Sequence, residues 1–278
     1  GGGKTLIELC RRQNTPKGKV IASQGVARLA ITMDPTLAFP GQKTFEAITV
    51  LLPLLQLDEK VKRDTIMNFE GLMALTNLSH IDETHTNKII TTKEMIPSVE
   101  AVALEEHPMV RRAAVQLMCN LSKSEKYIKP VVDGTAGDRL KILILMCQED
   151  DMETRSAAAG ALAMMTAREP QVSKMIRGAA ASWQESLEFI CFDAEASIRH
   201  RGLILLQNIS EACIETAEIL SKTPLKEILT GMSRDLDDAW SEDILELEDQ
   251  GQMRILLKEL SQKVLDTWVE LKLIQPNL

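Results

Sequence analysis

The sequence predicts an all-α protein built as a solenoid, a stack of similar helical units along one axis. Arg111, Arg155 and Arg199 stand 44 residues apart, and this interval is typical of units made of two or three helices. Aromatic residues make up only 3% of the 278 residues, so Leu, Ala, Ile and Met must fill the core, which suits closely packed helices. Long runs of β-branched and aromatic residues between turn signals, which would indicate strands, are missing.

Other residue types repeat at nearly the same interval. The pairs separated by about one or two strides are Pro53 and Pro97, Cys147 and Cys191, Asn77 and Asn120, and Asn120 and Asn208. In such a stack each unit packs only on its neighbours. The chain therefore needs no second domain, and we expect it to present one long groove rather than one pocket.

The strongest helical segments recur in one register. Each has small or apolar residues at helical spacing, and three of the four end in Asn, then Leu or Ile, then Ser. These segments are 69–79, 112–122, 156–166 and 200–210, with 22–32 as a degenerate fifth copy.

A second helix is expected before each of the strong ones. The segments are 45–57, 94–104, 138–147, 183–192 and 225–232, and shorter third helices are expected at 124–132 and 172–177. Proline disrupts a helix interior, so Pro53 and Pro97 indicate either a kink or the first turn of a new helix. Three helices per unit favour about five armadillo repeats over the two-helix HEAT form.

The two ends of the chain differ from the repeats. We interpret residues 1–19 as a leader or loop remnant, 20–235 as the repeat domain and 236–278 as an acidic linker followed by a capping helix. The cap is expected at 252–273, where an apolar residue occurs every fourth position and covers the last apolar face. These positions are Leu256, Leu260, Val264 and Trp268. The acidic run at 235–249 is interpreted as a solvated loop.

Charge and composition exclude several classes of partner. The net charge of −8 argues against nucleic acid, which usually needs a basic face. No apolar run reaches the roughly 18–20 residues of a membrane span, so no membrane partner is expected. The five cysteines form no CxxC pair, which predicts buried, reduced thiols and a cytoplasmic location.

Signatures of catalysis are also missing. The segment Gly1–Thr5, GGGKT, looks like the end of a phosphate-binding loop, but the earlier glycine and the leading strand are absent. A nucleotide hydrolase using Gly3–Thr5 is therefore a weak rival interpretation. The four histidines are interpreted as surface residues without a metal set. We expect no enzyme activity, no cofactor and no metal.

The asparagine positions are the best candidates for partner binding. Asn77, Asn120 and Asn208 fall on the last helix of their units, and each side chain offers a donor and an acceptor to an extended backbone. The alternative is that each asparagine bridges neighbouring helices. Glu70 and Arg201 lie seven residues before an asparagine and share its face.

Arg112 and His200 are further candidates for partner contact. The 44-residue arginine series instead turns to the opposite side of the helix, where we expect a structural role in ion pairing at helix starts. The segment 33–42, MDPTLAFPGQ, is bounded by prolines and is expected to display Leu37 and Phe39 to a partner. Its alternative is a loop folded back onto the first repeat.

Several of these segments resemble the UCS domain of the myosin-specific chaperones. The resemblance is carried by ARLAITMDPTLAFPGQ, NFEGLMALTNLS, DRLKILILMCQEDD, SAAAGALAMMTA and IRHRGLILLQNIS. It implies a right-handed armadillo superhelix whose concave groove binds the myosin motor domain and aids its folding and assembly. It also implies recruitment of a heat-shock chaperone through a tetratricopeptide module that no part of this chain resembles.

The rival within the same fold is a generic armadillo adaptor that binds extended peptides. Adaptors of nuclear import place a tryptophan beside each groove asparagine. Here Trp183, Trp240 and Trp268 lie outside the last-helix pattern, which counts against this interpretation.

Overall fold

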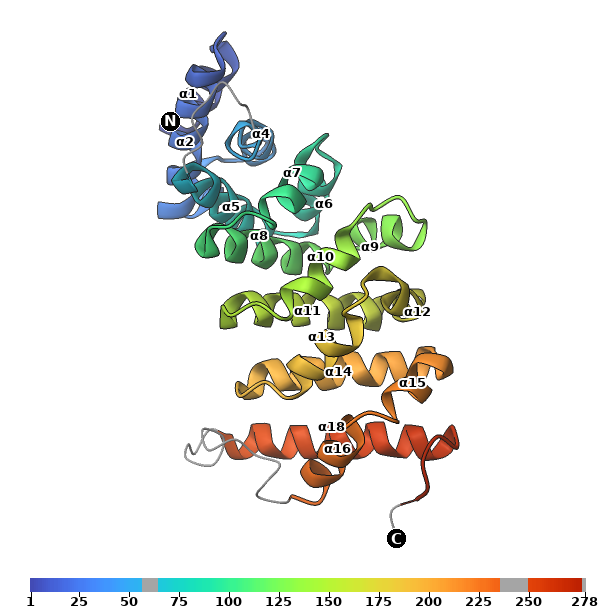
Figure 1. Ribbon diagram of the computed structural model, residues 1–278. Coiled ribbons are helices and arrows are strands. Elements are labelled where there is room, and N and C mark those ends of the chain that lie inside the picture. Colours follow the sequence, from blue (N-terminus) through green and yellow to red (C-terminus); the bar gives the residue numbers. More distant parts are fainter. Residues whose placement is uncertain (57–64, 236–249, 277–278) are drawn as a thin grey trace. The chain divides into compact units, whose positions relative to one another are not determined.

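The computed structural model describes residues 1–56, 65–235 and 250–276, and these residues form helices and connecting turns without a strand (Figure 1). They divide into two compact units, residues 1–127 and 128–278. The predicted all-α class is confirmed, and each unit is built from short helices that alternate with long ones.

Unit 1 begins with a pair of helices, and two sets follow in which short helices precede a long one. In chain order they are α1 (Gly2–Arg12), α2 (Pro16–Thr32), α3 (Pro35–Ala38), α4 (Lys43–Val50), the 3-10 helix η1 (Leu52–Leu54), α5 (Thr65–Ser79), α6 (Glu83–Thr91), α7 (Met95–Val102) and α8 (Pro108–Leu121). The long helices α2, α5 and α8 pack in sequence, each on the one before it.

Unit 2 repeats the same order of two short helices and one long helix. It contains most of α9 (Glu125–Val132), then α10 (Arg139–Met146), α11 (Met152–Arg168), α12 (Pro170–Ala179), α13 (Trp183–Cys191), α14 (Ala196–Ala212), α15 (Ile214–Leu220), α16 (Leu225–Ser233) and α18 (Gln250–Glu270). Figure 1 shows α11, α14 and α18 side by side. The expected three helices per repeat are therefore present.

Both prolines of the second-helix family begin new helices. Pro53 lies in η1, directly after α4 ends at Val50, and Pro97 lies in the first turn of α7. A proline in a first turn costs little because the N–H groups there have no helical partner. Of the two alternatives, the helix start is correct and the kink is not.

Small residues set how closely the last helix of a repeat approaches the second helix. A Cβ added to Gly202 of α14 would lie 3.0 Å from backbone atoms of Ile190 and Cys191 in α13. A Cβ added to Gly71 of α5 would lie 2.9 Å from Leu54. The residues one stride apart between them, Ala114 and Ala158, are fully buried. A small residue therefore recurs at this position in α5, α8, α11 and α14.

The C-terminal helix is part of a repeat rather than a separate region. α18 packs on α14 and α16, the position that α14 itself takes on α11 and α13. The Trp268 indole nitrogen donates to Ser210 Oγ at 2.9 Å, and both side chains are buried. The predicted boundary at residue 235 thus divides the fifth helical triplet, while the acidic segment 236–249 lies outside the described residues.

The predicted buried face of α18 needs one correction. Val264 and Trp268 are buried as expected, but Leu256 is exposed and Leu257 is buried in its place. A spacing of four residues advances 400° in a helix and so drifts about 40° per step, which moves the first position off the face.

The N-terminal segment is also helical rather than a loop remnant. α1 begins at Gly2 and packs on α2 and α4, with Gly3, Ile7 and Cys10 buried. Its apolar positions follow helical spacing, so the segment belongs to the core of unit 1.

The cysteines are free thiols, as expected, but only three of the five are buried: Cys10, Cys147 and Cys191. Burial raises the pKa of Cys147 to about 12 and raises the pKa of Cys191 in the same direction, which keeps both as unreactive thiols near neutral pH.

Replacing Gly202 tests the close approach. We expect Gly202→Leu to lower the free energy of unfolding by about 1–3 kcal/mol or more, because the new side chain must displace the α13 backbone. Urea unfolding measures the change. Gly251→Leu is the control, since a side chain added there meets no neighbour. Equal stability of the two variants would contradict the close approach.

Candidate partner-binding surface

The three asparagines hold equivalent, half-exposed positions on the long helices, Asn77 and Asn120 in unit 1 and Asn208 in unit 2. These positions and their neighbours on the same helix faces are called the row below. The Nδ2 of Asn77 donates to the Ala30 carbonyl at 3.1 Å, and that of Asn120 donates to Ser79 Oγ at 3.4 Å. In unit 2 the Nδ2 of Asn208 donates to Ala163 O and Thr166 Oγ1 at 3.2 and 3.0 Å. Each amide therefore bridges to the preceding long helix, which is the structural alternative, while its half-exposed position leaves the partner role a proposal.

The charged members of this row form bridges of the same kind. Glu70 accepts from Arg28 Nε at 2.8 Å and from Gln24 Nε2 at 2.7 Å. In unit 2 Arg201 donates to the carbonyl and the hydroxyl of Ser156. All of these contacts join residues 42–46 positions apart, so they link successive long helices. The row is held in place by its own repeats before any partner binds.

The other two charged candidates lie beside the row. Arg112 and His200 are half-buried near the first turns of α8 and α14. Burial, and then the charge of Arg201, lowers the pKa of His200, so its imidazole stays neutral at physiological pH. We therefore expect His200 to offer one donor and one acceptor rather than a charge.

The two apolar residues in the segment between α2 and α4 differ in their exposure to solvent. Leu37 lies in α3 and is 73% exposed, as predicted. Phe39 is fully buried, so the prediction that it is displayed is wrong. Asp34 caps α3 through Thr36 N at 2.8 Å, and the short helix then turns the Phe39 ring against Gly3 of α1.

One histidine was also assigned wrongly to the surface. His85 is buried, and its ring stacks on Phe45 with the centroids 4.3 Å apart. Its Nδ1 contacts Asp82 Oδ1 and its Nε2 contacts Thr44 Oγ1, both at 2.8 Å. It therefore joins α6 to α4 and belongs to the structure of unit 1.

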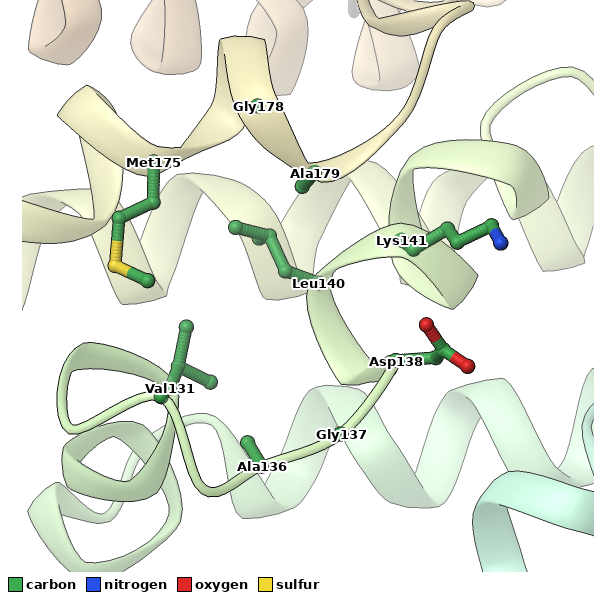
Figure 2. A pocket seen from close by; sticks show the side chains of 10 residues that line it. Val131, Ala136, Gly137, Asp138, Leu140, Lys141, Met175, Gly178 and Ala179 are labelled. Atoms are coloured by element: carbon green, nitrogen blue, oxygen red, sulfur yellow. The ribbon is translucent and has the colours of Figure 1, made fainter.

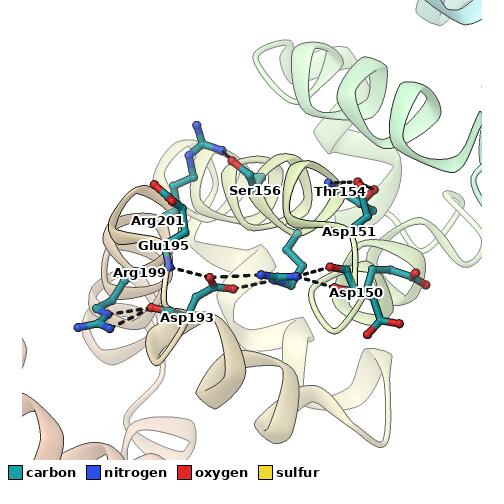
Figure 3. Close-up of polar contacts among 10 residues, drawn as sticks. Asp150, Asp151, Thr154, Ser156, Asp193, Glu195, Arg199 and Arg201 are labelled. Atoms are coloured by element: carbon teal, nitrogen blue, oxygen red, sulfur yellow. Dashed lines mark hydrogen bonds and ion pairs between the residues drawn. The ribbon is translucent and has the colours of Figure 1, made fainter. Parts of the chain in front are cut away.

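The 44-residue arginines support the repeat connections. Each guanidinium donates to the carbonyl six residues before it: Glu105, Glu149 and Asp193, at 3.1, 2.9 and 3.0 Å. Arg155 also pairs with the buried Asp193 carboxylate of the next repeat, with 2.6 Å between Nε and Oδ2. Figure 3 shows Asp193 and Arg199 in the same cluster. The predicted ion pair at a helix start is confirmed for Arg155.

A pocket in unit 2 was missed by the sequence analysis. It has a volume of about 460 Å³ and lies between the α9–α10 connection, the start of α10 and the end of α12 (Figure 2). Gly134 and Gly137 bound the connection, both with φ in the left-handed region. The two closely spaced glycines in DGTAGD were the available signal, but they indicate a turn and say nothing about which helix lies opposite.

Two kinds of feature are absent from the residues that the structure describes. Within them no group of three His, Cys, Asp or Glu side chains is arranged to hold a metal ion. No described helix combines the length and the apolar character needed to cross a membrane.

Successive triplets with a long last helix define an armadillo-repeat protein. A solved structure of computationally designed armadillo proteins shares this fold, with a TM-score of 0.69 and 16% identity over 94% of this chain and 99% of its own. No family profile matches the chain.

Relatives with higher sequence identity define the family more narrowly than the fold does. Protein unc-45 homolog B of Xenopus tropicalis is 37% identical over 85% of this chain and 25% of its own length. UNC-45 from Drosophila melanogaster has a TM-score of 0.81 and 34% identity, covering 99% of this chain and 32% of that one. The chain is therefore homologous to UNC-45, and its repeats match the armadillo-like region of that protein.

A further solved structure, 24% identical with a TM-score of 0.75, covers 95% of this chain and 28% of the other. It is that of the UNC-45 chaperone and concerns the features critical for binding and folding muscle myosin. The chain spans about a quarter of the length of the UNC-45 relatives in sequence. The resemblance predicted from the sequence segments is confirmed at the level of the family.

Removing Arg155 tests the connection between repeats. We expect Arg155→Ala to lower the free energy of unfolding by about 3–5 kcal/mol, because Asp193 is left as a buried charge without its partner. Chemical denaturation measures the loss. Arg28→Ala removes an ion pair whose arginine is exposed and should cost at most about 1 kcal/mol. A similar small loss in both variants would show that the Arg155 pair carries no special role.

Proposed function

We propose that this chain is a protein-binding module of a myosin chaperone, working in the cytoplasm without a cofactor or catalysis of its own. The observation that carries the proposal is 37% identity to unc-45 homolog B, spread over 85% of the chain. Homology of that extent reaches into both units and is not confined to one motif. The UNC-45 structure concerned with binding and folding muscle myosin supplies the partner class.

In this proposal the motor domain of myosin binds the half-exposed row on the long helices. The row combines amides at Asn120 and Asn208, charges at Glu70 and Arg201, and methionines at Met73 and Met164. Amide groups can pair with exposed backbone, and methionine side chains adapt to varied apolar surfaces. A partly folded motor domain exposes both kinds of surface, so these positions can hold it without recognising a single sequence.

Because the row is already bridged to neighbouring helices, binding orders few side chains. Little conformational entropy is lost, which offsets part of the cost of association. The amide nitrogens already donate to the preceding helix. The amide oxygens and the adjacent apolar surface would therefore make most of the contacts with the partner. We expect modest affinity and ready release, as a chaperone requires.

The test measures light scattering of heated myosin motor domain with and without the purified chain. The chain is expected to lower the scattering at equimolar ratio. The variant Asn120→Ala plus Arg201→Glu should bind about tenfold more weakly, since each hydrogen bond left unmade costs about 1–3 kcal/mol. Lys222→Ala, which removes an exposed ion pair with Glu218 of α15, is the matched control.

Thermal unfolding of each variant separates lost binding from lost folding. Scattering unaffected by the wild-type chain would refute the proposed function. Full activity of the double variant would move the binding surface away from this row. Binding of unstructured peptides without any effect on the motor domain would favour the generic armadillo adaptor.

A further inference from the structure

The pocket between α9, α10 and α12 has the size and lining of a binding site. Its volume of about 460 Å³ lies within the roughly 300–1,000 Å³ usual for ligand pockets. Its apolar wall consists of Val131, Ala136, Leu140, Met175 and Ala179. Figure 2 shows Leu140, Val131 and Met175 around the apolar space, with Asp138 and Lys141 together at one side.

The wall formed by the α9–α10 connection is fixed before any ligand arrives. The N–H groups of Thr135 and Ala136 both donate to the Pro130 carbonyl, at 2.8 and 2.9 Å. Gly134 N donates to Val131 O at 3.1 Å. A wall with satisfied backbone groups needs little reorganisation on binding, which lowers the entropic cost.

Gly178 lines the pocket and leaves the space beside the α12 backbone open. It lies within α12, outside the left-handed region, and a Cβ built on it meets no atom within 4 Å. Glycine in a helix is destabilising relative to alanine, and here no packing contact within the described structure requires it. A glycine of this kind is expected where another molecule approaches the backbone closely.

Asp138 and Lys141 give the open side of the pocket its polarity. Asp138 stands at the N-cap of α10, yet its side chain makes no capping hydrogen bond. An aspartate at this position usually caps the helix and stabilises it. Its carboxylate is therefore available as an acceptor, three residues from the exposed donor Lys141.

We propose that this pocket takes apolar side chains, of the size of leucine or methionine, together with the backbone between them, from an extended segment of a partner polypeptide. The acceptor Asp138 and the donor Lys141 match the N–H and C=O groups that flank such a side chain in an extended backbone. One acid and one base together also fit a neutral peptide better than a free anion or cation. The proposal rests on the proposed function only for the identity of that polypeptide.

The first arm of the test does not involve myosin. The ¹³C-methyl signal of Met175, assigned by Met175→Leu, is followed while acetyl-Leu-Leu-amide is added. We expect a saturable shift in the wild type and in Gly251→Leu, and loss of that shift in Gly178→Leu. Gly178→Leu should unfold at no lower temperature than the wild type, because leucine favours the helix and meets open space. No saturable shift in the wild type, or an equal shift in Gly178→Leu, would overturn the proposal.

The second arm measures binding of the myosin motor domain to the same variants. Reduced binding by Gly178→Leu but not by Gly251→Leu would assign the apolar side chain to myosin. If the wild type does not bind the motor domain, the proposed function fails and the peptide arm still decides the pocket.

Discussion

The close approach of each long helix to the short helix before it is the constraint on which the rest of the structure depends. At Gly202 the α13 backbone lies 3.0 Å from the place of a Cβ, so only the smallest side chains allow this packing. Small residues also stand at the equivalent positions Gly71, Ala114 and Ala158. Within each unit, successive long helices pack on one another, so side chains reach from one long helix to the next.

The side chains that link successive repeats make two kinds of contact, one at the helix starts and one on the half-exposed face. At the helix starts, Arg155 donates to the Glu149 carbonyl and pairs with the buried carboxylate of Asp193. Breaking this pair is costly because it leaves a buried charge without its partner. On the half-exposed face, Asn208 and Arg201 make weaker bridges that remain in contact with solvent. The same stride thus produces a buried ion pair on one side of the repeat and half-exposed bridges on the other.

Much of the fold follows from periodicity alone, because each repeat packs only on its neighbours. The long helices and most of the short ones were predictable in this way, whereas the pattern at Pro53 and Pro97 left a kink and a helix start as alternatives. The failures are residues whose environment depends on contacts distant in sequence. Phe39 is buried because α1 lies beneath it, and His85 is buried because Thr44 and Phe45 face it. Nothing in the local pattern around either residue encodes those neighbours.

The candidate surface shows the same limit, since the asparagine row could be located from its spacing but the partners of its amides could not. Site-specific photo-crosslinking tests most directly whether this row binds myosin. A benzophenone side chain at Gln116 or Ile204, both half-exposed on the row, is compared with one at the exposed Lys222. If the row binds myosin, we expect crosslinks to the motor domain from Gln116 and Ile204 and none from Lys222. Crosslinks from Lys222 alone, or from none of the three positions, would contradict it.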